Sequence, residues 1–470
     1  MTLMNPMRLN RRSVLAGAGG LSLAAVSKTA GPAAAVADRP ERPGQATLLR
    51  GASLVLTMDP HIGDGELGLL KDADVLLRDG RIAEVGRQLE APRGARVRDV
   101  AGRFVLPGFV DIHNHLWQSS IRGGCSDQDL VGWLKTCNLS TLPKIDPAGM
   151  YAFVHLSALD ALQAGVTTLV DWVHAIPYAT SERYVQALDD AGLRFVYAMA
   201  SFKGAEEQVR TVKERLLDPL PLASAQIAVH ARKGSIATVR ASWKQAQDLG
   251  LMLNSHVLEH RTDRAEEQIA TLREIGAFGP SLLMNHAVHL SREEIALLGD
   301  HDVRVAHCPL SNMRLASGVM PLPKLHKAGV KMGLGHDGGT NDTSDMFALM
   351  KAAVGLQRAV HEDPQIQPAL PAVLRMGTLG GAEAIGMADQ VGSLTPGKRA
   401  DVLVLDPGTL NFAPRFDWTS QIVLNGQPLN ITDVYVDGRL RKTGGELVGV
   451  DTEKVVLAAE EAAARLTSTP

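Results

Sequence analysis

The chain has 470 residues, of which 45% are hydrophobic and 21% charged, a composition typical of a globular protein with a large core. This length predicts about two to three structural units. The net charge of −3 and the aromatic content of 4% argue against a nucleic-acid-binding protein, because such proteins normally present a basic face.

The N-terminal segment has the three parts of a secretory signal. Arg11 and Arg12 precede an apolar, Gly- and Ala-rich run that ends near Val26, and a small-residue triplet follows at 35–37. With paired arginines, this order is typical of a twin-arginine signal peptide. We expect residues 1–37 to be removed and the mature protein to be exported, to the periplasm or outside the cell. No other stretch of about 20 apolar residues occurs, so no membrane span is expected after removal of the signal.

The sequence of residues 46–104 predicts short strands separated by turns, and residues 391–450 have the same sequence pattern. Both segments alternate apolar and polar residues and contain Asp-Gly turns, which is the pattern of β-hairpins. Because the two segments flank a long middle region, we predict one small β-sandwich assembled from both ends of the chain.

The middle region, residues 105–390, alternates apolar strands with amphipathic helical stretches. Eight strands are predicted, at residues 105–115, 165–172, 194–201, 225–231, 251–259, 281–288, 303–311 and 330–338. Eight consecutive strand–helix repeats are the pattern of a (β/α)8 TIM barrel of the α/β class. Polar residues cluster at the carboxyl ends of these strands, where such barrels place their active sites.

Three cysteines occur, Cys125, Cys137 and Cys308. Cys125 and Cys137 could form a disulfide in an oxidising compartment, and two free thiols are at least as compatible with the sequence. Their spacing does not resemble a zinc knuckle.

A cluster of histidines and one aspartate is predicted at the barrel mouth. His113 and His115 lie two apart on the first strand, so both side chains leave the same face. Buried groups of this kind need hydrogen-bond partners or a metal, and their convergence on one mouth favours a metal. The other members end the fifth, sixth, seventh and eighth strands: His256, His286, His307 and Asp337.

The chain resembles the amidohydrolase superfamily, in particular its branch of hydrolytic deaminases and chlorohydrolases. The matching stretches run from about 105 to 405 and are VLPGFVDIHNHLWQSSIRG, GVTTLVD, SHVLE, NHAVHLSREEI, VAHCPLSNMRLASGV, GVKMGLGHDG and GSLTPGKRADVLVLD. Members of that branch act on cytosine, guanine, S-adenosylhomocysteine and chlorinated triazines.

The resemblance implies a role for each matching residue. Glu259 matches the glutamate that shuttles protons between water and the leaving group, and His286 matches the histidine that hydrogen-bonds the activated water or the substrate. Asp337 would be both a ligand and the base that takes the proton from the water. The implied ligands of one divalent ion, Zn²⁺ or alternatively Fe²⁺, are His113, His115, His256 and Asp337.

Six further residues are expected to contact the substrate. Trp117 and Gln118 directly follow the histidine pair, as a flat wall and an amide that could read a planar ring. Arg122 and Asn312 match family positions near the substrate or its loops. The remaining two, His230 and His307, end the fourth and seventh strands.

Three departures from the family pattern bear on the chemistry. Relatives with two metals use a carboxylated lysine at the end of the fourth strand; here that strand contains no lysine, which favours a single ion, although Lys233 lies just beyond. A Pro-His-x-Pro-Tyr element of the S-adenosylhomocysteine deaminases is replaced by residues 229–233, which weakens the case for those nucleosides. His336 stands where the family usually has threonine, either as a substrate contact or as a simple replacement.

Together these features predict hydrolysis of a planar C–N bond, with deamination of an N-heterocycle as its principal form. Ring opening of a cyclic amide and hydrolytic dechlorination are the alternatives within enzymes. A metal-dependent binding protein without turnover is the alternative from another class, and Glu259 together with Asp337 argues against it, because a binder needs neither acid nor base. The expected partner is a small-molecule substrate, and a homo-oligomer is compatible with the sequence.

Overall fold

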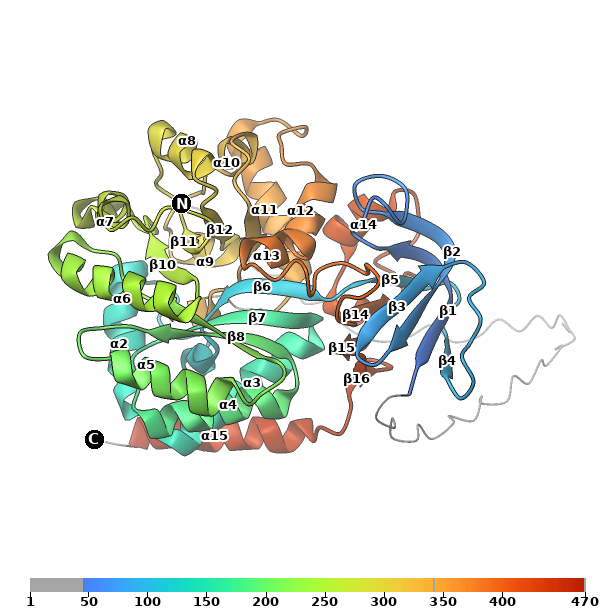
Figure 1. Cartoon of the computed structure of the whole chain (residues 1–470), viewed down its shortest axis with the longest axis horizontal. Coiled ribbons are helices and arrows are strands. Elements are labelled where there is room, and N and C mark those ends of the chain that lie inside the picture. Colours follow the sequence, from blue (N-terminus) through green and yellow to red (C-terminus); the bar gives the residue numbers. More distant parts are fainter. Residues whose placement is uncertain (1–44, 341–342, 469–470) are drawn as a thin grey trace, which may run out of the picture. The chain divides into compact units, whose positions relative to one another are not determined.

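A computed structural model describes residues 45–340 and 343–468 of the chain (Figure 1). The predicted signal peptide, residues 1–37, lies outside the described residues. None of the helices in the described part is long and apolar enough to cross a membrane.

Eight parallel strands close into a barrel, in which each strand pairs with its neighbours in chain order. This confirms the predicted TIM barrel, and every predicted strand overlaps the corresponding barrel strand. The strands are β6 (Phe109–Asn114), β7 (Val166–Val173), β8 (Arg194–Ala200), β9 (Ala223–Ala228), β10 (Leu253–Val257), β11 (Leu282–His286), β12 (Arg304–His307) and β13 (Met332–Leu334).

The barrel strands are apolar on both faces because both faces are buried. Along β7, Val170 and Trp172 join an apolar cluster with residues of β6 and β8, inside the barrel. The alternating residues Leu169 and Val173 join the larger cluster that the surrounding helices share. A strand side chain points to opposite faces at successive positions, so this alternation assigns one face to the interior and the other to the helix layer.

Helices follow the barrel strands and pack outside them (Figure 1). The larger helices after the barrel strands are α3 (Pro147–Gln163), α4 (Tyr178–Ala191), α5 (Glu206–Val212), α6 (Ile236–Leu249), α7 (Gln268–Glu274), α8 (Arg292–Asp300), α9 (Pro309–Arg314), α10 (Leu322–Lys327), α11 (Met346–His361), α12 (Leu370–Met376) and α13 (Leu379–Ala384). Short helices α1 (Leu130–Trp133) and α2 (Leu139–Thr141) precede α3, and α14 (Trp418–Asn425) and α15 (Thr452–Ser468) come later.

Local sequence explains where several of these helices begin and end. Ser291 and Glu294 form a reciprocal capping box at the start of α8, which satisfies two backbone N–H groups that the helix leaves without partners. Helices α4 and α6 both stop at a glycine in the left-handed conformation, Gly192 at φ 73° and Gly250 at φ 65°. Glycine adopts this conformation without the steric cost of a Cβ atom.

The segments from the two ends of the chain form one nine-stranded sheet, as the sequence predicts. Its order is β17-β16-β15-β14-β5-β1-β2-β3, and β4 pairs with β1. The strands are β1 (Thr47–Leu56), β2 (Leu69–Arg78), β3 (Arg81–Gly86), β4 (Arg96–Asp99), β5 (Phe104–Pro107), β14 (Val402–Leu405), β15 (Ile431–Val436), β16 (Arg439–Thr443) and β17 (Glu446–Leu447).

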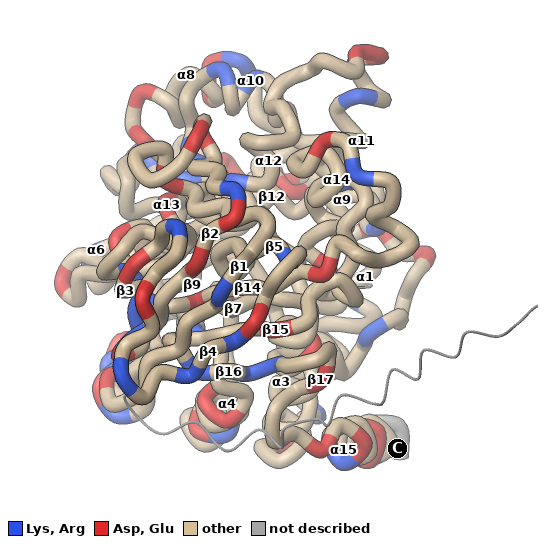
Figure 2. The backbone as a smooth tube through the Cα atoms, turned by 90° about the vertical axis from the view of Figure 1, so that its right-hand side faces the viewer, with Lys and Arg blue, Asp and Glu red and all other residues tan. Residues whose placement is uncertain are grey.

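The two faces of this sheet have different partners. On β1, Leu54 and Leu56 belong to the apolar cluster shared with the barrel helices, whereas Val55 belongs to a separate cluster within the sheet. Basic and acidic residues are interspersed along its strands (Figure 2). The sheet therefore has a small core of its own and an apolar face toward the barrel.

A buried ion pair joins this sheet to the amino-terminal end of the barrel. Arg194, the first residue of β8, contacts both carboxylate oxygens of Asp401 at 3.3 Å and Oδ1 of Asp437 at 3.4 Å. Thr168 donates to Asp401 as well. Although burial opposes the charge of Arg194, the two aspartates raise its pKa above the ordinary value.

The structure pairs Cys125 with Cys137 in a disulfide, within the segment between β6 and α3, and leaves Cys308 buried as a free thiol. Cys125 and Cys137 pack against a small apolar cluster that includes Trp133 and Leu315. Of the two alternatives that the sequence leaves open, the geometry favours the disulfide.

Candidate metal and catalytic site

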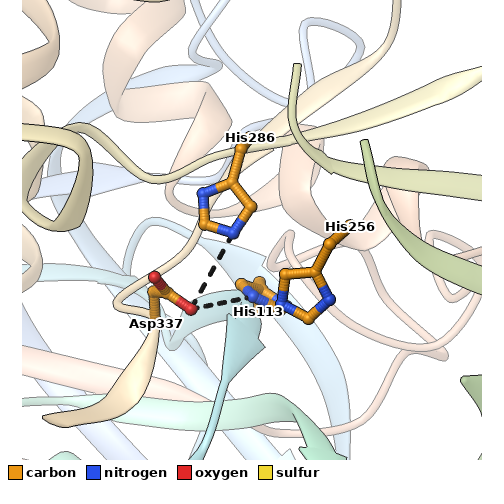
Figure 3. Close-up of side chains that lie close together, drawn as sticks. All are labelled: His113, His256, His286 and Asp337. Atoms are coloured by element: carbon orange, nitrogen blue, oxygen red, sulfur yellow. Dashed lines mark ion pairs between the residues drawn. The ribbon is translucent and has the colours of Figure 1, made fainter. Parts of the chain in front are cut away.

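The histidines and the aspartate that the sequence places at strand ends meet at the carboxyl-terminal mouth of the barrel. Figure 3 shows His113, His256 and His286 directed toward Asp337. Each comes from a different strand or strand end: His113 from β6, His256 from β10, His286 from β11, and Asp337 from the turn after β13. One ligand atom from each lies within 4.8 Å of all the others.

Asp337 is the centre of this group. Its Oδ1 lies 3.0 Å from Nε2 of His113, 3.3 Å from Nε2 of His115 and 3.9 Å from Nε2 of His286. Nε2 of His115 also lies 3.3 Å from Nε2 of His256. Ligands about 2.0–2.1 Å from a tetrahedral ion are separated by roughly 3.3 Å, so these spacings match those around one ion.

Hydrogen bonds set the orientation of two of the rings. Nδ1 of His115 donates to the carbonyl of Trp172 at 2.6 Å, which turns the lone pair of Nε2 toward Asp337. His286 has the opposite arrangement, because the amide of Asn312 donates to its Nδ1 at 3.1 Å. The hydrogen of the neutral ring then lies on Nε2, so His286 is suited to donate a hydrogen bond.

The donor set fits a divalent metal ion. Nδ1 of His256 and Nε2 of His286 are buried and have no hydrogen-bond partner within residues 45–340 and 343–468, and Nε2 of His113 lies 3.0 Å from Oδ1 of Asp337. Burial lowers the pKa of His113 and His256, and lowers that of His286 to about 3. Neutral imidazoles beside a carboxylate are the ligand type that zinc and similar ions prefer.

Two buried carboxyl groups at the site have opposite protonation tendencies. Burial, reinforced by the charge of Asp337, raises the pKa of Glu259 well above its ordinary value. Burial also acts to raise the pKa of Asp337, but the imidazoles of His286 and His113 hold it well below the ordinary value. Oε2 of Glu259 lies 3.5 Å from Nε2 of His286. The pKa values of these two neighbouring carboxyl groups are therefore shifted in opposite directions.

Aromatic rings surround the group on one side. The indole of Trp117 donates to Nδ1 of His174 at 3.1 Å, and the His174 ring lies 5.1 Å from that of His115. The Trp172 ring lies 4.9 Å from that of His230, and His230 stacks at 5.5 Å on His256. His230 thus lies beside the predicted ligand His256, whereas Trp117 approaches the group through His174.

The other predicted substrate contacts have varied surroundings. Gln118 is buried and accepts from the backbone of Gly339. The amide of Asn312 donates a hydrogen bond to His286. His307 is buried, and neither of its ring nitrogens has a hydrogen-bond partner in the described part of the chain. Arg122 pairs with Asp160 at 3.1 Å, with about 40% of each side chain exposed.

Lys233, the residue that could support a second ion, pairs with Glu267 at 2.7 Å, and its side chain is 67% exposed. Its amino group is thus occupied by an ion pair in solvent.

Sequence reasoning missed several residues of the site. Trp172 and His174 alternate inward at the end of β7 and approach the histidines, and Ser311 donates to Oδ2 of Asp337. Asp111 lies two residues before His113 and accepts four hydrogen bonds behind the site. The period of two along a strand could have indicated Asp111 and His174, because both share a face with identified residues.

The backbone is unusual at two of these positions. His286 has φ 71° and Asp337 has φ 63°, in the left-handed region that residues with a side chain rarely adopt. Such conformations cost about 1–3 kcal/mol each and cluster at functional sites, where the surrounding structure maintains them. Their position agrees with a functional role for the group.

Comparison with known proteins places the whole barrel, together with strands β5, β14 and β15 of the sheet, in one family. The protein-family profile described as "Amidohydrolase family" matches residues 104–441. The 5'-deoxyadenosine deaminase of Methanothermobacter thermautotrophicus is 31% identical over 433 residues, which cover 88% of this chain and 99% of the relative.

Solved structures give the same fold. An adenosine deaminase from Xanthomonas campestris with bound zinc has a TM-score of 0.82 at 25% identity, covering 92% of this chain and 100% of that one. The atrazine chlorohydrolase of Arthrobacter aurescens TC1, complexed with zinc, has a TM-score of 0.80 at 22% identity, covering 89% and 100%. The chain therefore belongs to the amidohydrolase family and is a hydrolase that acts on carbon–nitrogen bonds.

Proposed function

We propose that this protein hydrolytically deaminates a planar N-heterocycle with the help of one divalent metal ion. The observation that carries the proposal is the convergence of three imidazoles and one carboxylate, with ligand atoms within 4.8 Å of one another, next to Glu259, whose pKa burial raises well above its ordinary value. The deaminase relative, with its 31% identity over 88% of the chain, supports the same reaction.

In this proposal His113, His115, His256 and Asp337 hold the ion. When bound, a divalent ion acts as a Lewis acid and makes water a nucleophile near neutral pH. Zinc is the expected ion, because histidine nitrogen and carboxylate oxygen suit it and a zinc-bound adenosine deaminase has the same fold. The hydrogen on Nε2 of His286 makes this residue a donor to the water or the substrate instead of a fifth ligand.

The carboxyl groups divide the proton transfers. Asp337, whose pKa its histidine neighbours lower, takes a proton from the attacking water. A C–O bond forms at the ring carbon, and Glu259 delivers a proton to the amine. The C–N bond then breaks and ammonia leaves, since an amine is a poor leaving group until it is protonated. His286 orients the reacting atoms. Its Nε2 lies 3.5 Å from Oε2 of Glu259.

The walls of the site favour a flat substrate. Trp117, Trp172, His174 and His230 supply rings on one side of the metal ligands, and aromatic rings stack on heterocycles. The curated deaminase relative acts on an adenine nucleoside. Residues 229–233 nevertheless depart from the element that such deaminases carry, so a base or another purine is as suitable a first probe as a nucleoside.

Two measurements test the proposal. The metal content of the purified protein should be about one equivalent per chain, as expected for one set of four ligands. Ammonia release should then be assayed on adenosine, 5'-deoxyadenosine, guanine, cytosine, a pterin and a chlorinated triazine. Release of ammonia from at least one heterocycle is the expected result. Chloride release alone, ring opening alone, or tight binding without turnover of any probe would each contradict deamination.

We also propose that the protein is exported through a twin-arginine signal. Residues 1–37 have the composition of such a signal, and the disulfide between Cys125 and Cys137 suits an oxidising compartment. The twin-arginine route carries folded proteins, which suits an enzyme that takes up its metal before export. Replacing Arg11 and Arg12 with lysine should retain the protein inside the cell, and the mature form should begin near Asp38. Unchanged export of this variant would overturn the twin-arginine assignment.

A further inference from the structure

His336 directly precedes Asp337, and its ring is hydrogen-bonded to Asp111, which is not one of the predicted metal ligands. Its Nδ1 donates to Oδ2 of Asp111 at 2.9 Å, and its side chain is 3% exposed. Its backbone N–H donates to the other oxygen of the same carboxylate at 3.2 Å. Nδ1 of His336 is therefore occupied by Asp111, while its Nε2 is buried without a hydrogen-bond partner in the described residues.

Asp111 gathers hydrogen bonds from both sides of the barrel junction where β13 meets β6. On the β6 side, Oδ1 accepts from the backbone of His113 at 3.2 Å and Oδ2 from the amide of Asn114 at 2.6 Å. On the β13 side, both oxygens accept from His336. One fully buried carboxylate therefore connects the strand that carries His113 and His115 to the turn that carries Asp337.

This junction has little other regular support. Strands β13 and β6 share a single residue pair, Leu334 with Asp111, whereas β7 and β8 share six. The backbones also approach very closely, because a Cβ atom on Gly335 would lie 2.8 Å from that of His113. One further backbone bond, from Asp337 to His113 at 2.9 Å, crosses the same junction. Between β13 and β6, side-chain hydrogen bonds to Asp111 thus provide a connection that backbone hydrogen bonds between neighbouring strands provide elsewhere in the barrel.

We propose that His336, acting through Asp111, is a positioning residue that holds Asp337 at the distance from His113 and His115 that one metal ion requires. The inference rests on the proposed metal site. Its physical basis is that an ion needs its ligands at nearly fixed separations, and that hydrogen bonds behind the ligands maintain them. The observed separations from Oδ1 of Asp337 are 3.0 Å to His113 and 3.3 Å to His115.

The test uses substitutions that retain or remove the single donor at Nδ1. In His336→Asn the amide nitrogen replaces Nδ1, so the bond to Asp111 is retained. In His336→Gln the amide lies where Nε2 was, and in His336→Leu no donor remains. Each full-length variant is loaded with Co²⁺, and its affinity is measured by competition with a chelator. The visible absorption of the bound Co²⁺ reports the coordination geometry, and thermal unfolding of the metal-free forms reports stability separately.

We expect His336→Asn to stay close to the parent protein, and His336→Gln and His336→Leu to lose about 10–100-fold in Co²⁺ affinity, the usual effect of removing such a partner. Their Co²⁺ spectra should also change. Asp111→Asn should behave like His336→Leu. The matched control, Asp401→Asn, removes a charge at the opposite end of the barrel and should lower stability without changing affinity or spectrum.

Two results would overturn the proposal. One is an unchanged affinity and spectrum in both His336→Gln and His336→Leu; the other is a loss in His336→Asn as large as in His336→Leu. If His336→Leu does not fold, the comparison of the asparagine and glutamine variants decides the question. A parent protein that binds no Co²⁺ at all would instead contradict the proposed function, so the two failures are distinguishable.

Discussion

The two ends of the barrel differ in whether their buried polar groups have hydrogen-bond or ion-pair partners. At the amino-terminal end, Arg194 and Asp401 are both almost fully buried, and each satisfies the other at 3.3 Å. At the carboxyl-terminal end, His113, His256 and His286 present ring nitrogens that have no hydrogen-bond partner anywhere in the described residues. Among the described residues, the ion pair at the amino-terminal end is satisfied, whereas several buried ring nitrogens at the other end have no partner.

This difference identifies the end that performs chemistry. A buried polar group without a partner costs about 1–3 kcal/mol, so a protein keeps several of them together only where a ligand supplies the missing partner. The left-handed backbone at His286 and Asp337 adds a further cost at the same end. The stability of the fold must therefore come from elsewhere, including the satisfied ion pair at the amino-terminal end.

Of the changes considered, removing the metal should have the largest effect on the activity of the carboxyl-terminal end. Asp337→Asn takes away a ligand charge and the base for the water, so we expect loss of both measurable turnover and tight metal binding. Treating the parent protein with a chelator should likewise abolish turnover while far-UV circular dichroism stays nearly unchanged, because the buried apolar area supplies the fold. Full turnover in the metal-free protein would show that the carboxyl-terminal end works without an ion.

Glu259→Gln tests whether Glu259 transfers protons without being a metal ligand. Glutamine keeps the size and hydrogen-bonding shape of the side chain but carries no proton, so turnover should fall by about 10²–10⁴-fold. The metal content should stay at that of the parent protein, measured by elemental analysis. Loss of the ion in this variant would make Glu259 a ligand, and near-normal turnover would contradict its role as shuttle.

At the amino-terminal end the same type of change should affect stability alone. Arg194→Met leaves Asp401 buried without its partner, and the free energy of unfolding should fall by about 3–5 kcal/mol, the usual cost of breaking a buried ion pair. Urea unfolding measures this loss, and kcat/KM of the folded protein should not change. A fall in kcat/KM at unchanged stability would mean that the two ends are coupled.

The disulfide between Cys125 and Cys137 lies in the segment between β6 and α3. Removing it measures how much this disulfide contributes to the stability of the protein. Replacing both Cys125 and Cys137 with serine opens a loop with a sequence separation of 12. We expect a loss of about 2–4 kcal/mol in the free energy of unfolding, read from thermal or urea unfolding. A variant as stable as the parent would show that the apolar cluster around Trp133 holds this segment by itself.

The smallest effect is expected at Lys233. Its ion pair with Glu267 is largely exposed, and exposed pairs contribute about 0–1 kcal/mol. Lys233→Ala should therefore keep the metal content, the turnover and the stability of the parent protein. A second equivalent of metal in the parent that disappears in this variant would overturn the single-ion site.

Much of the fold follows from local patterns. The eight barrel strands are apolar runs followed by helices, and each predicted run overlaps the corresponding observed strand. The sheet from both chain ends was predicted as well, from its alternation and its Asp-Gly turns. The helix starts at Ser291 and the stops at Gly192 and Gly250 are also local, because capping depends on a few neighbouring residues.

The sequence by itself determined which residues end barrel strands, and therefore which histidines and carboxylates gather at one mouth. Strand periodicity is local, and barrel closure follows from repetition, so His113, His256, His286 and Asp337 could be grouped before any coordinates. Only the tertiary structure decided what each ring faces: the tautomers of His115 and His286, and the bonds of Trp117 to His174 and of His336 to Asp111. Those contacts join residues up to 225 positions apart, and a local pattern carries no information about a partner that only folding brings into reach.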